Sequence, residues 1–236
     1  MTRLLSWFQV IKTWAKSRIV EILFWFQVIM IWVYAIPQAK HLIAGKTTGL
    51  TLALWLCFLG YLVVGLSLSI LAYREPILNK ETEEERLKEK KKRLYTILIF
   101  ALIGLVMFGL FLLAIKTVRW TTGDTAVSIV VVVLSILTSC YFRSIKDPMA
   151  RGWLAVWCKG VAQLWAGYVM FTSVSSEWIP PLSMLATHGT MWTRFFQVYS
   201  QGKSGGWDRP TKGLMLGESS NVISWSLVTI LWFFLR

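Results

Sequence analysis

Ionisable and amide side chains interrupt the apolar stretches in the second half of the chain. Lys159 and Gln163 lie four residues apart, so they share one face of a helix, and His188 and Trp192 have the same spacing. Asn221 follows in the last apolar stretch. A charged or hydrogen-bonding group within an apolar stretch is costly in lipid and typically faces a partner or a polar cavity. These side chains predict a polar pocket that binds a small solute.

Aromatic rings are the second component of the predicted pocket. Trp55 and Trp192 would offer flat walls that suit a sugar ring or a heterocycle, by stacking and cation–π contact. Other interpretations stay open. Most of the 14 Trp residues are expected to anchor at membrane interfaces, His188 is equally well explained as an interhelical hydrogen-bond partner, and Arg194 as a side chain that extends to a nearby interface. Lys159 is the leading candidate, because a buried amine needs a partner.

The sequence carries no pattern typical of an enzyme, a metal site or a cofactor site. It has no Gly-rich phosphate loop, no His-Glu-x-x-His, no nucleophile elbow and no Cys-x-x-Cys pair. Cys57, Cys140 and Cys158 fall inside apolar stretches, where they are explained as small buried hydrophobes. We therefore expect no catalysis, no metal and no cofactor.

The elements that must position these side chains are membrane helices. Of the 236 residues, 56% are hydrophobic, and seven stretches approach or exceed the roughly 20 residues that cross a bilayer. The stretches are 19–37, 49–72, 95–116, 124–143, 153–173, 179–200 and 216–235. They predict an all-α, polytopic membrane protein in contact with lipid. The net charge of +13 does not indicate a nucleic-acid partner, because Lys and Arg gather between the spans, where membrane topology and anionic lipid explain them.

Charge also predicts the ends and the orientation of the chain. Residues 1–18 place apolar and basic side chains on opposite helical faces, which predicts an amphipathic helix in the membrane interface. The charged loop 74–95 is interpreted as a solvated, partly helical linker. Most Lys and Arg residues lie on the N-terminal side of the predicted spans. This distribution places the N-terminus in the cytoplasm and the C-terminus on the opposite side.

One stretch carries a family resemblance. Pro37-Gln38, followed by Gly49-Leu50-Thr51 and Trp55, resembles the signature of the PQ-loop family of small membrane transporters, which includes the SWEET sugar carriers. A proline bends or ends a helix, so Pro37 and Gln38 are the expected hinge beside a polar path. SWEET-type members are expected to turn this loop toward the cytoplasm, whereas the charge distribution here places it outside. We follow the charge distribution.

Seven spans are also explained by two copies of a three-helix unit joined by a linker helix, with the binding site between the copies. The units would be 19–116 and 153–236, and the linker helix 124–143. Gln163 marks the second copy in the favoured alternative, and Gln197, with the later Gly213–Leu216, marks it in the other. A weaker likeness to nicotinamide-riboside carriers, through Gly152-Trp153 and the spacing of Gly189 and Trp192, implies the same three-one-three plan.

Two functions compete at this stage. The first is a transporter of a small uncharged or zwitterionic solute (a sugar, nucleoside or amino-acid derivative) that works by alternating access. The second is a non-catalytic scaffold or accessory subunit, with a homo-oligomer or another membrane complex as its partner. A membrane enzyme that acts on lipid is disfavoured, because the spans contain no acidic pair. A transporter needs a continuous polar cavity around Lys159, Gln163 and Asn221, whereas a scaffold would bury these groups against one another.

Overall fold

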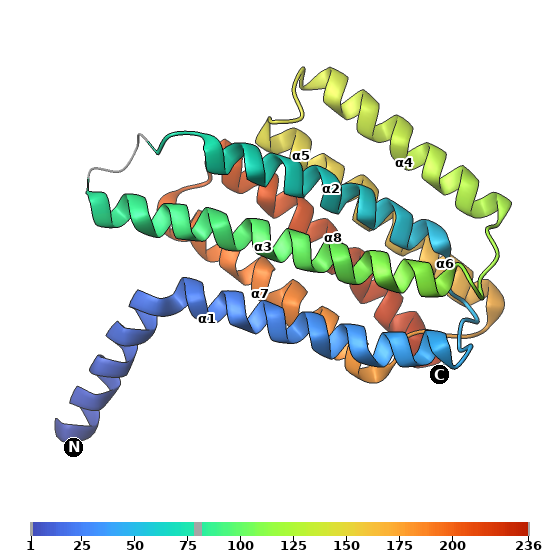
Figure 1. Cartoon of the computed structure of the whole chain (residues 1–236), viewed down its shortest axis with the longest axis horizontal. Coiled ribbons are helices and arrows are strands. Elements are labelled where there is room, and N and C mark those ends of the chain that lie inside the picture. The colour runs from blue at the N-terminus through green and yellow to red at the C-terminus, as the bar shows by residue number, and fades with distance from the viewer. Residues whose placement is uncertain (1, 78–81, 236) are drawn as a thin grey trace.

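The computed structural model of the chain is a bundle of helices that run alternately up and down along one axis, with some neighbours parallel and others antiparallel (Figure 1). It describes the backbone of residues 2–77 and 82–235 and the side chains of residues 21–77, 82–203 and 206–235. The helices are α1 (Thr2–Ile43), α2 (Leu52–Arg74), α3 (Glu83–Ala114), α4 (Thr122–Tyr141), α5 (Pro148–Ala155), α6 (Ala162–Ser173), α7 (Pro181–Gly205) and α8 (Arg209–Phe234). A π-helical turn, η1 (Val156–Val161), joins α5 to α6 in one continuous span. The described residues form no strand, which confirms the all-α prediction.

Five helices of the described chain are long and apolar enough to cross a membrane. They are Glu21–Ile43 of α1, together with α2, α3, α4 and α8. The other two predicted spans are helical but less uniform: the π turn divides the α5–η1–α6 span into shorter pieces, and α7 carries His188 and Arg194. The protein is therefore embedded in a membrane, and the two spans richest in the candidate polar side chains are the least typical membrane helices.

Several helix boundaries differ from the sequence prediction. α1 does not end at Pro37 but continues to Ile43, with the proline inside it. The predicted interfacial helix 1–18 is not a separate element, because α1 begins at Thr2, although its first part turns away from the rest of the helix (Figure 1). The helical linker expected within 74–95 is present from Glu83 onward, but it is the start of α3 rather than a separate element, and Thr82 accepts a hydrogen bond from the Glu85 amide there. Residues 78–81 of that predicted loop lie outside the described part.

Two helices each pack between two others. α3 packs between α1 and α2, and α8 packs between α7 and the α5–η1–α6 span. α1 also contacts α7, and α2 contacts η1 and α6. α4 lies at the edge of the bundle, against α2, α5, η1 and α6 (Figure 1).

Glycines bring α8 close to the α5–η1–α6 span. A Cβ built on Gly213 would lie 2.1 Å from the Pro148 carbonyl oxygen, and one on Gly152 would lie 2.3 Å from the Gly213 carbonyl oxygen. Farther along the same span, a Cβ on Gly160 would lie 2.5 Å from the Ser220 hydroxyl oxygen, and one on Gly167 would contact Leu231 at 3.3 Å. Small residues allow helix backbones in lipid to approach in this way. The α5–η1–α6 span and α8 therefore form one tightly packed pair.

A buried carboxylate joins the starts of α2 and α4. Asp124 is 2% exposed. Its Oδ2 accepts hydrogen bonds from the Thr121 backbone nitrogen at 3.0 Å and from the Thr121 hydroxyl at 2.8 Å. Its Oδ1 accepts from the Thr51 hydroxyl, from the Ala53 backbone nitrogen at 3.2 Å and from the Trp165 indole at 3.4 Å. One side chain thus holds three helices together, because Trp165 belongs to α6.

Candidate functional site

A cavity of about 970 Å³ lies inside the bundle. Residues of α1, α2, α3, η1, α6, α7 and α8 line it, and none of its described lining residues comes from α4. The lining reaches the exposed residues Lys92 and Gln201, at the end of the bundle where α3 begins and α7 ends. Toward the other end it extends no further than Tyr34 on α1 and Trp225 on α8, although on α2 it includes Leu54 in the first turn. The cavity therefore approaches one end of the bundle and, along α1 and α8, stops short of the other.

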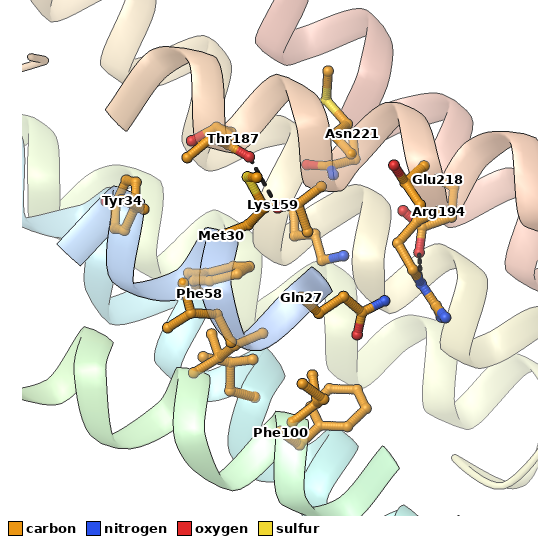
Figure 2. A pocket seen from close by; sticks show the side chains of 18 of the residues that line it. Gln27, Met30, Tyr34, Phe58, Phe100, Lys159, Thr187, Arg194, Glu218 and Asn221 are labelled. Carbon is orange, nitrogen blue, oxygen red and sulfur yellow. Dashed lines mark hydrogen bonds and ion pairs between the residues drawn. The ribbon is translucent and has the colours of Figure 1, made fainter. Parts of the chain in front are cut away.

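Lys159 projects into this cavity from the π turn. The residue is 8% exposed, and its Nζ lies over the Tyr61 ring, 4.4 Å from the ring centroid. Tyr61 lies on α2, so this cation–π contact joins η1 to α2. Figure 2 shows the amine among side chains contributed by different helices. Single π turns inside α-helices are frequent at functional sites.

A network of amide and hydroxyl groups lies one turn further along the same span. Gln163 Nε2 donates a hydrogen bond to Asn221 Oδ1 at 2.8 Å, and Gln163 Oε1 accepts one from the Ser224 hydroxyl. Both partners belong to α8. Gln163 and Asn221 line the cavity, so these contacts fix a polar wall next to Lys159.

Glu218 is the only acidic residue among the described residues that line the cavity. It lies on α8, three residues before Asn221, and its Oε1 is 3.8 Å from Arg194 Nε on α7. The basic lining residues are Lys92, Lys159 and Arg194. Positive charge therefore exceeds negative charge around the cavity.

Apolar and aromatic side chains form the remaining walls. Trp55 and Trp225 are almost fully buried, and Phe58, Phe100 and Met107 line the cavity with them. Figure 2 places Phe58 and Phe100 across the cavity from the Arg194–Glu218 pair. The site thus combines one polar side with a broad apolar side, an arrangement typical of small-molecule sites.

The structure separates the residues predicted to form the pocket into two sets. Lys159, Gln163, Asn221 and Trp55 meet at the cavity. His188 and Trp192 are not among its lining residues, although their neighbours on α7 are. His188 Nε2 instead forms a 2.6 Å hydrogen bond with the Thr229 hydroxyl, which matches its interpretation as an interhelical partner.

Trp192 lies outside the cavity for a simple packing reason. It is 38% exposed and stacks on Phe196 of its own helix, with ring centroids 5.7 Å apart. The four-residue spacing of His188 and Trp192 therefore placed them on one face of α7, but that face is not the one that borders the cavity.

Pro37 and Gln38 also lie away from the cavity, at the end of the bundle that it does not reach. Gln38 is fully buried, and its Nε2 donates a 2.6 Å hydrogen bond to the Trp178 carbonyl oxygen. Its Oε1 is buried without a partner in the described structure. The amide at the predicted hinge therefore forms a single contact across the bundle, to the segment between α6 and α7.

Further contacts join the helix ends around Gln38. The Ser183 hydroxyl donates to the Tyr34 carbonyl oxygen at 2.8 Å, and the Trp232 indole donates to the Ile179 carbonyl oxygen at 3.0 Å. His41 Nδ1 lies 3.0 Å from the Glu177 carbonyl oxygen. Two of these contacts, like the Gln38 bond, connect α1 to residues that begin or precede α7. Polar contacts from α1 and α8 to the start of α7 and the segment before it therefore close this end of the bundle.

Sequence reasoning missed two contacts of the site. The partner that Lys159 was expected to need is the Tyr61 ring, which no local spacing connects to it, because the two are 98 positions apart in the chain. Arg194 was considered only as a side chain that extends to an interface, and its pairing with Glu218 joins two helices that the sequence does not place side by side. Outside the site, the buried Asp124 was detectable, since Thr121-x-x-Asp124 has the spacing of a helix capping box.

Comparisons of the chain with protein-family models, curated proteins and solved structures find no match. The site is therefore interpreted from its own geometry.

Proposed function

We propose that this protein carries a small solute across the membrane by alternating access. The observation that supports this best is the cavity around Lys159, Gln163 and Asn221, which approaches one end of the bundle and is shut off from the other. A carrier in one of its two states has this form, with a central site that is reached from a single side. The resemblance of the Pro37-Gln38 stretch to PQ-loop transporters favours the same function.

The packing of the helices is consistent with a repeat of two three-helix units. The two proposed groups are α1, α2 and α3, and the α5–η1–α6 span with α7 and α8. In each group the third helix, α3 or α8, packs between the first and the second. α1 with Gln38 and the α5–η1–α6 span with Gln163 then hold equivalent places, which favours Gln163 over Gln197 as the mark of the second copy. α4 serves as the linker helix at the edge. The cavity lies between the units, where rocking of one unit against the other would transfer access.

The orientation follows from the distribution of charge. The cavity approaches the end of the bundle that carries the charged start of α3, with Glu83–Arg93. We propose that this end faces the cytoplasm, together with the N-terminus, because positive residues concentrate on that side. The present conformation is then the inward-facing one, and the C-terminus lies on the opposite side.

The scaffold hypothesis remains the alternative. It is favoured less, because a scaffold has no need of a cavity of about 970 Å³ with a buried amine in its wall. Its supporting feature is the broad exposed apolar surface of α4, including Ile129, Val133 and Ile136, which lipid covers equally well.

Access to the cavity from both sides is the direct test of transport. Thr187 lines the cavity, so we place a single cysteine there (Thr187→Cys) after replacing the three native cysteines by alanine. The protein is reconstituted in sealed vesicles, and a membrane-impermeant thiol reagent is added to one side at a time. Alternating access predicts modification from both sides, faster from the charged end of the bundle. Modification from that end alone would contradict transport and favour the scaffold.

Gln38→Leu should make the closed end easier to open. The substitution removes the hydrogen bond to the Trp178 carbonyl, one contact between the two groups at that end. A hydrogen bond of this kind contributes about 1 kcal/mol, so modification of the Thr187→Cys cysteine from the closed side should rise about fivefold. Thr172→Val is the control, because the Thr172 hydroxyl bonds only to carbonyls of its own helix. An equal rise in both variants would contradict the closing role of Gln38.

Pro37→Ala should act in the opposite direction. Proline leaves one α-helical hydrogen bond unmade, and alanine would restore it and stiffen α1. The protein should therefore keep its fold, while modification from the closed side and uptake of an identified solute both become slower. Ile36→Ala is the control, since Ile36 is 53% exposed and adjacent in the same helix. Unchanged rates in Pro37→Ala would exclude the hinge role.

A further inference from the structure

We infer that the cavity selects an organic anion with one negative charge, whose charged group binds beside Lys159 and whose apolar body packs against the aromatic wall. This inference rests on the proposed transport function for its biological meaning, because the anion would be the carried solute. The proposed solute class differs from the one that the sequence alone favours, which is an uncharged or zwitterionic compound.

The charged residues that line the cavity favour an anionic ligand. Three basic residues and one acidic residue line it in the described chain. Lys92 is exposed at the rim, so the inner balance is set by Lys159, Arg194 and Glu218. The Arg194–Glu218 pair is close to neutral, which leaves the Lys159 ammonium as the excess charge. A buried charge without a compensating anion is costly, so a monovalent anion would complete this site.

The position of Lys159 leaves room for such a partner. Its ammonium rests on the face of the Tyr61 ring at 4.4 Å, and a cation–π contact uses only one side of the ammonium. An ammonium group has three N–H donors. Gln27 and Asn221 line the same cavity, and Figure 2 shows the amine of Lys159 between them. A carboxylate there would accept hydrogen bonds from Lys159 and from an amide donor.

The same geometry disfavours a zwitterion. The ammonium of an amino acid would require an acceptor with negative charge, and Glu218 is the only acid among the described lining residues. Glu218 lies 3.8 Å from Arg194 on the neighbouring helix. An incoming ammonium would have to share this carboxylate with Arg194 and would add positive charge beside it, whereas an anion on Lys159 leaves the pair intact.

The opposite wall specifies the rest of the ligand. Trp55, Phe58 and Met107 offer apolar and aromatic surface without a charge. A ring or short hydrocarbon chain would leave water on binding there, which favours binding by about 25 cal/mol per Å² of buried apolar surface. The cavity thus fits a compound with a charged head and an apolar body.

The charge preference is measured first, on the Thr187→Cys protein in detergent. Modification rates are compared for an anionic thiol reagent (2-sulfonatoethyl methanethiosulfonate) and a cationic one (2-trimethylammonioethyl methanethiosulfonate), each normalised to its rate with 2-mercaptoethanol. The anionic reagent should react faster, and Lys159→Gln should lower the ratio about tenfold, as expected for the loss of one charge nearby in a partly screened site. Lys159→Arg should keep the ratio.

Four compounds with the same phenyl group then define the ligand class. They are 3-phenylpropionate, 3-phenylpropanamide, phenylalanine and phenethylamine, and each is tested for protection of the cysteine at position 187. The proposal predicts that 3-phenylpropionate protects best and that Lys159→Gln abolishes its advantage over the amide. Equal protection by phenylalanine would assign a zwitterion instead. Protection by none of the four, or a reagent ratio unaffected by Lys159→Gln, would overturn the proposal.

Two controls separate the effect of the Lys159 charge from the loss of any lysine and from misfolding. Lys40→Gln removes an exposed lysine that does not line the cavity, and it should leave the ratio unchanged. Thermal unfolding of Lys159→Gln establishes that the variant is folded. Because the protein is in detergent, the reagent ratio does not depend on any movement between two states. A failed charge preference therefore leaves the two-sided access test of transport unaffected, and a failed access test leaves the charge preference standing.

Discussion

Asp124→Ala should destabilise the protein more than any other single change at a polar residue. Its carboxylate accepts five hydrogen bonds, from Thr51, Ala53, Trp165 and both donors of Thr121. Alanine would leave the buried Thr51 hydroxyl and Ala53 amide without this acceptor and would remove the cap of α4, while the Trp165 indole keeps its 3.0 Å hydrogen bond to the Thr51 hydroxyl. Together these losses should cost about 3–5 kcal/mol. For a chain of this length that corresponds to a fall of about 10 °C in the unfolding temperature. Thermal unfolding in detergent measures it.

Asp147→Ala is the matched control for this prediction. Asp147 also caps a helix, since it accepts a 2.8 Å hydrogen bond from the Met149 backbone nitrogen at the start of α5. It pairs with Arg209 at 2.9 Å, and this hydrogen bond holds the pKa of the Asp147 carboxyl below its usual value. However, water reaches its side chain and can replace the lost acceptor. The fall in unfolding temperature should therefore be much smaller than for Asp124→Ala. Falls of equal size would contradict the prediction that the hydrogen bonds of Asp124 stabilise the packing of the three helices.

Gly213→Ala is the second substitution with a large expected effect. The new Cβ would lie 2.1 Å from the Pro148 carbonyl oxygen and 2.5 Å from its carbon. These are backbone atoms, so no side-chain rotation can relieve the clash, and α5 would have to move away from α8. Overpacking of this kind costs about 1–3 kcal/mol, and more where backbone must shift. We expect a lower unfolding temperature and a looser α5–α8 contact, which a cross-link between engineered cysteines on the two helices would report.

Gly109→Ala provides the comparison within the same protein. A Cβ on Gly109 meets nothing within 4 Å, and the residue lies inside α3. Alanine is a better helix former than glycine by about 1 kcal/mol, so this variant should be as stable as the native protein or slightly more stable. If the two glycine variants lose stability equally, the close approach of α8 to α5 is not what Gly213 provides.

The sequence was sufficient to predict the helices, because hydropathy is a local property. The apolar stretches between 49 and 72 and between 124 and 143 became α2 and α4 with shifts of a few residues. Boundaries were wrong where polar residues continue a helix. α1 extends past Pro37 to Ile43, and α3 starts at Glu83, although both segments have the composition of a loop.

Among the predicted site residues, only those on the helix face that borders the cavity were predicted correctly. Lys159 and Gln163 share a face and reach the cavity together. His188 and Trp192 share a face as well, but α1 and α8 pack around α7 so that the adjacent residues Thr187 and Met191 line the cavity instead. Which face of a helix borders a cavity depends on its neighbours, and a single sequence does not specify them. The contact of Lys159 with Tyr61 was undetectable for the same reason.

The π turn at Val156–Val161 changes which residues of the α5–η1–α6 span face α8. Gly152 and Gly160 are eight residues apart, and in a regular α-helix they would differ by about 80° around the axis. The extra residue of a π turn reduces this difference to about 20°, so that Gly152, Gly160 and Gly167 can all face α8. If the same residues wound as a regular α-helix throughout, Gly160 would stand about 80° away from Gly152, and one half of the span would be rotated out of alignment with α8. The π turn that carries Lys159 is thus also what allows α8 to pack against the span along its full length.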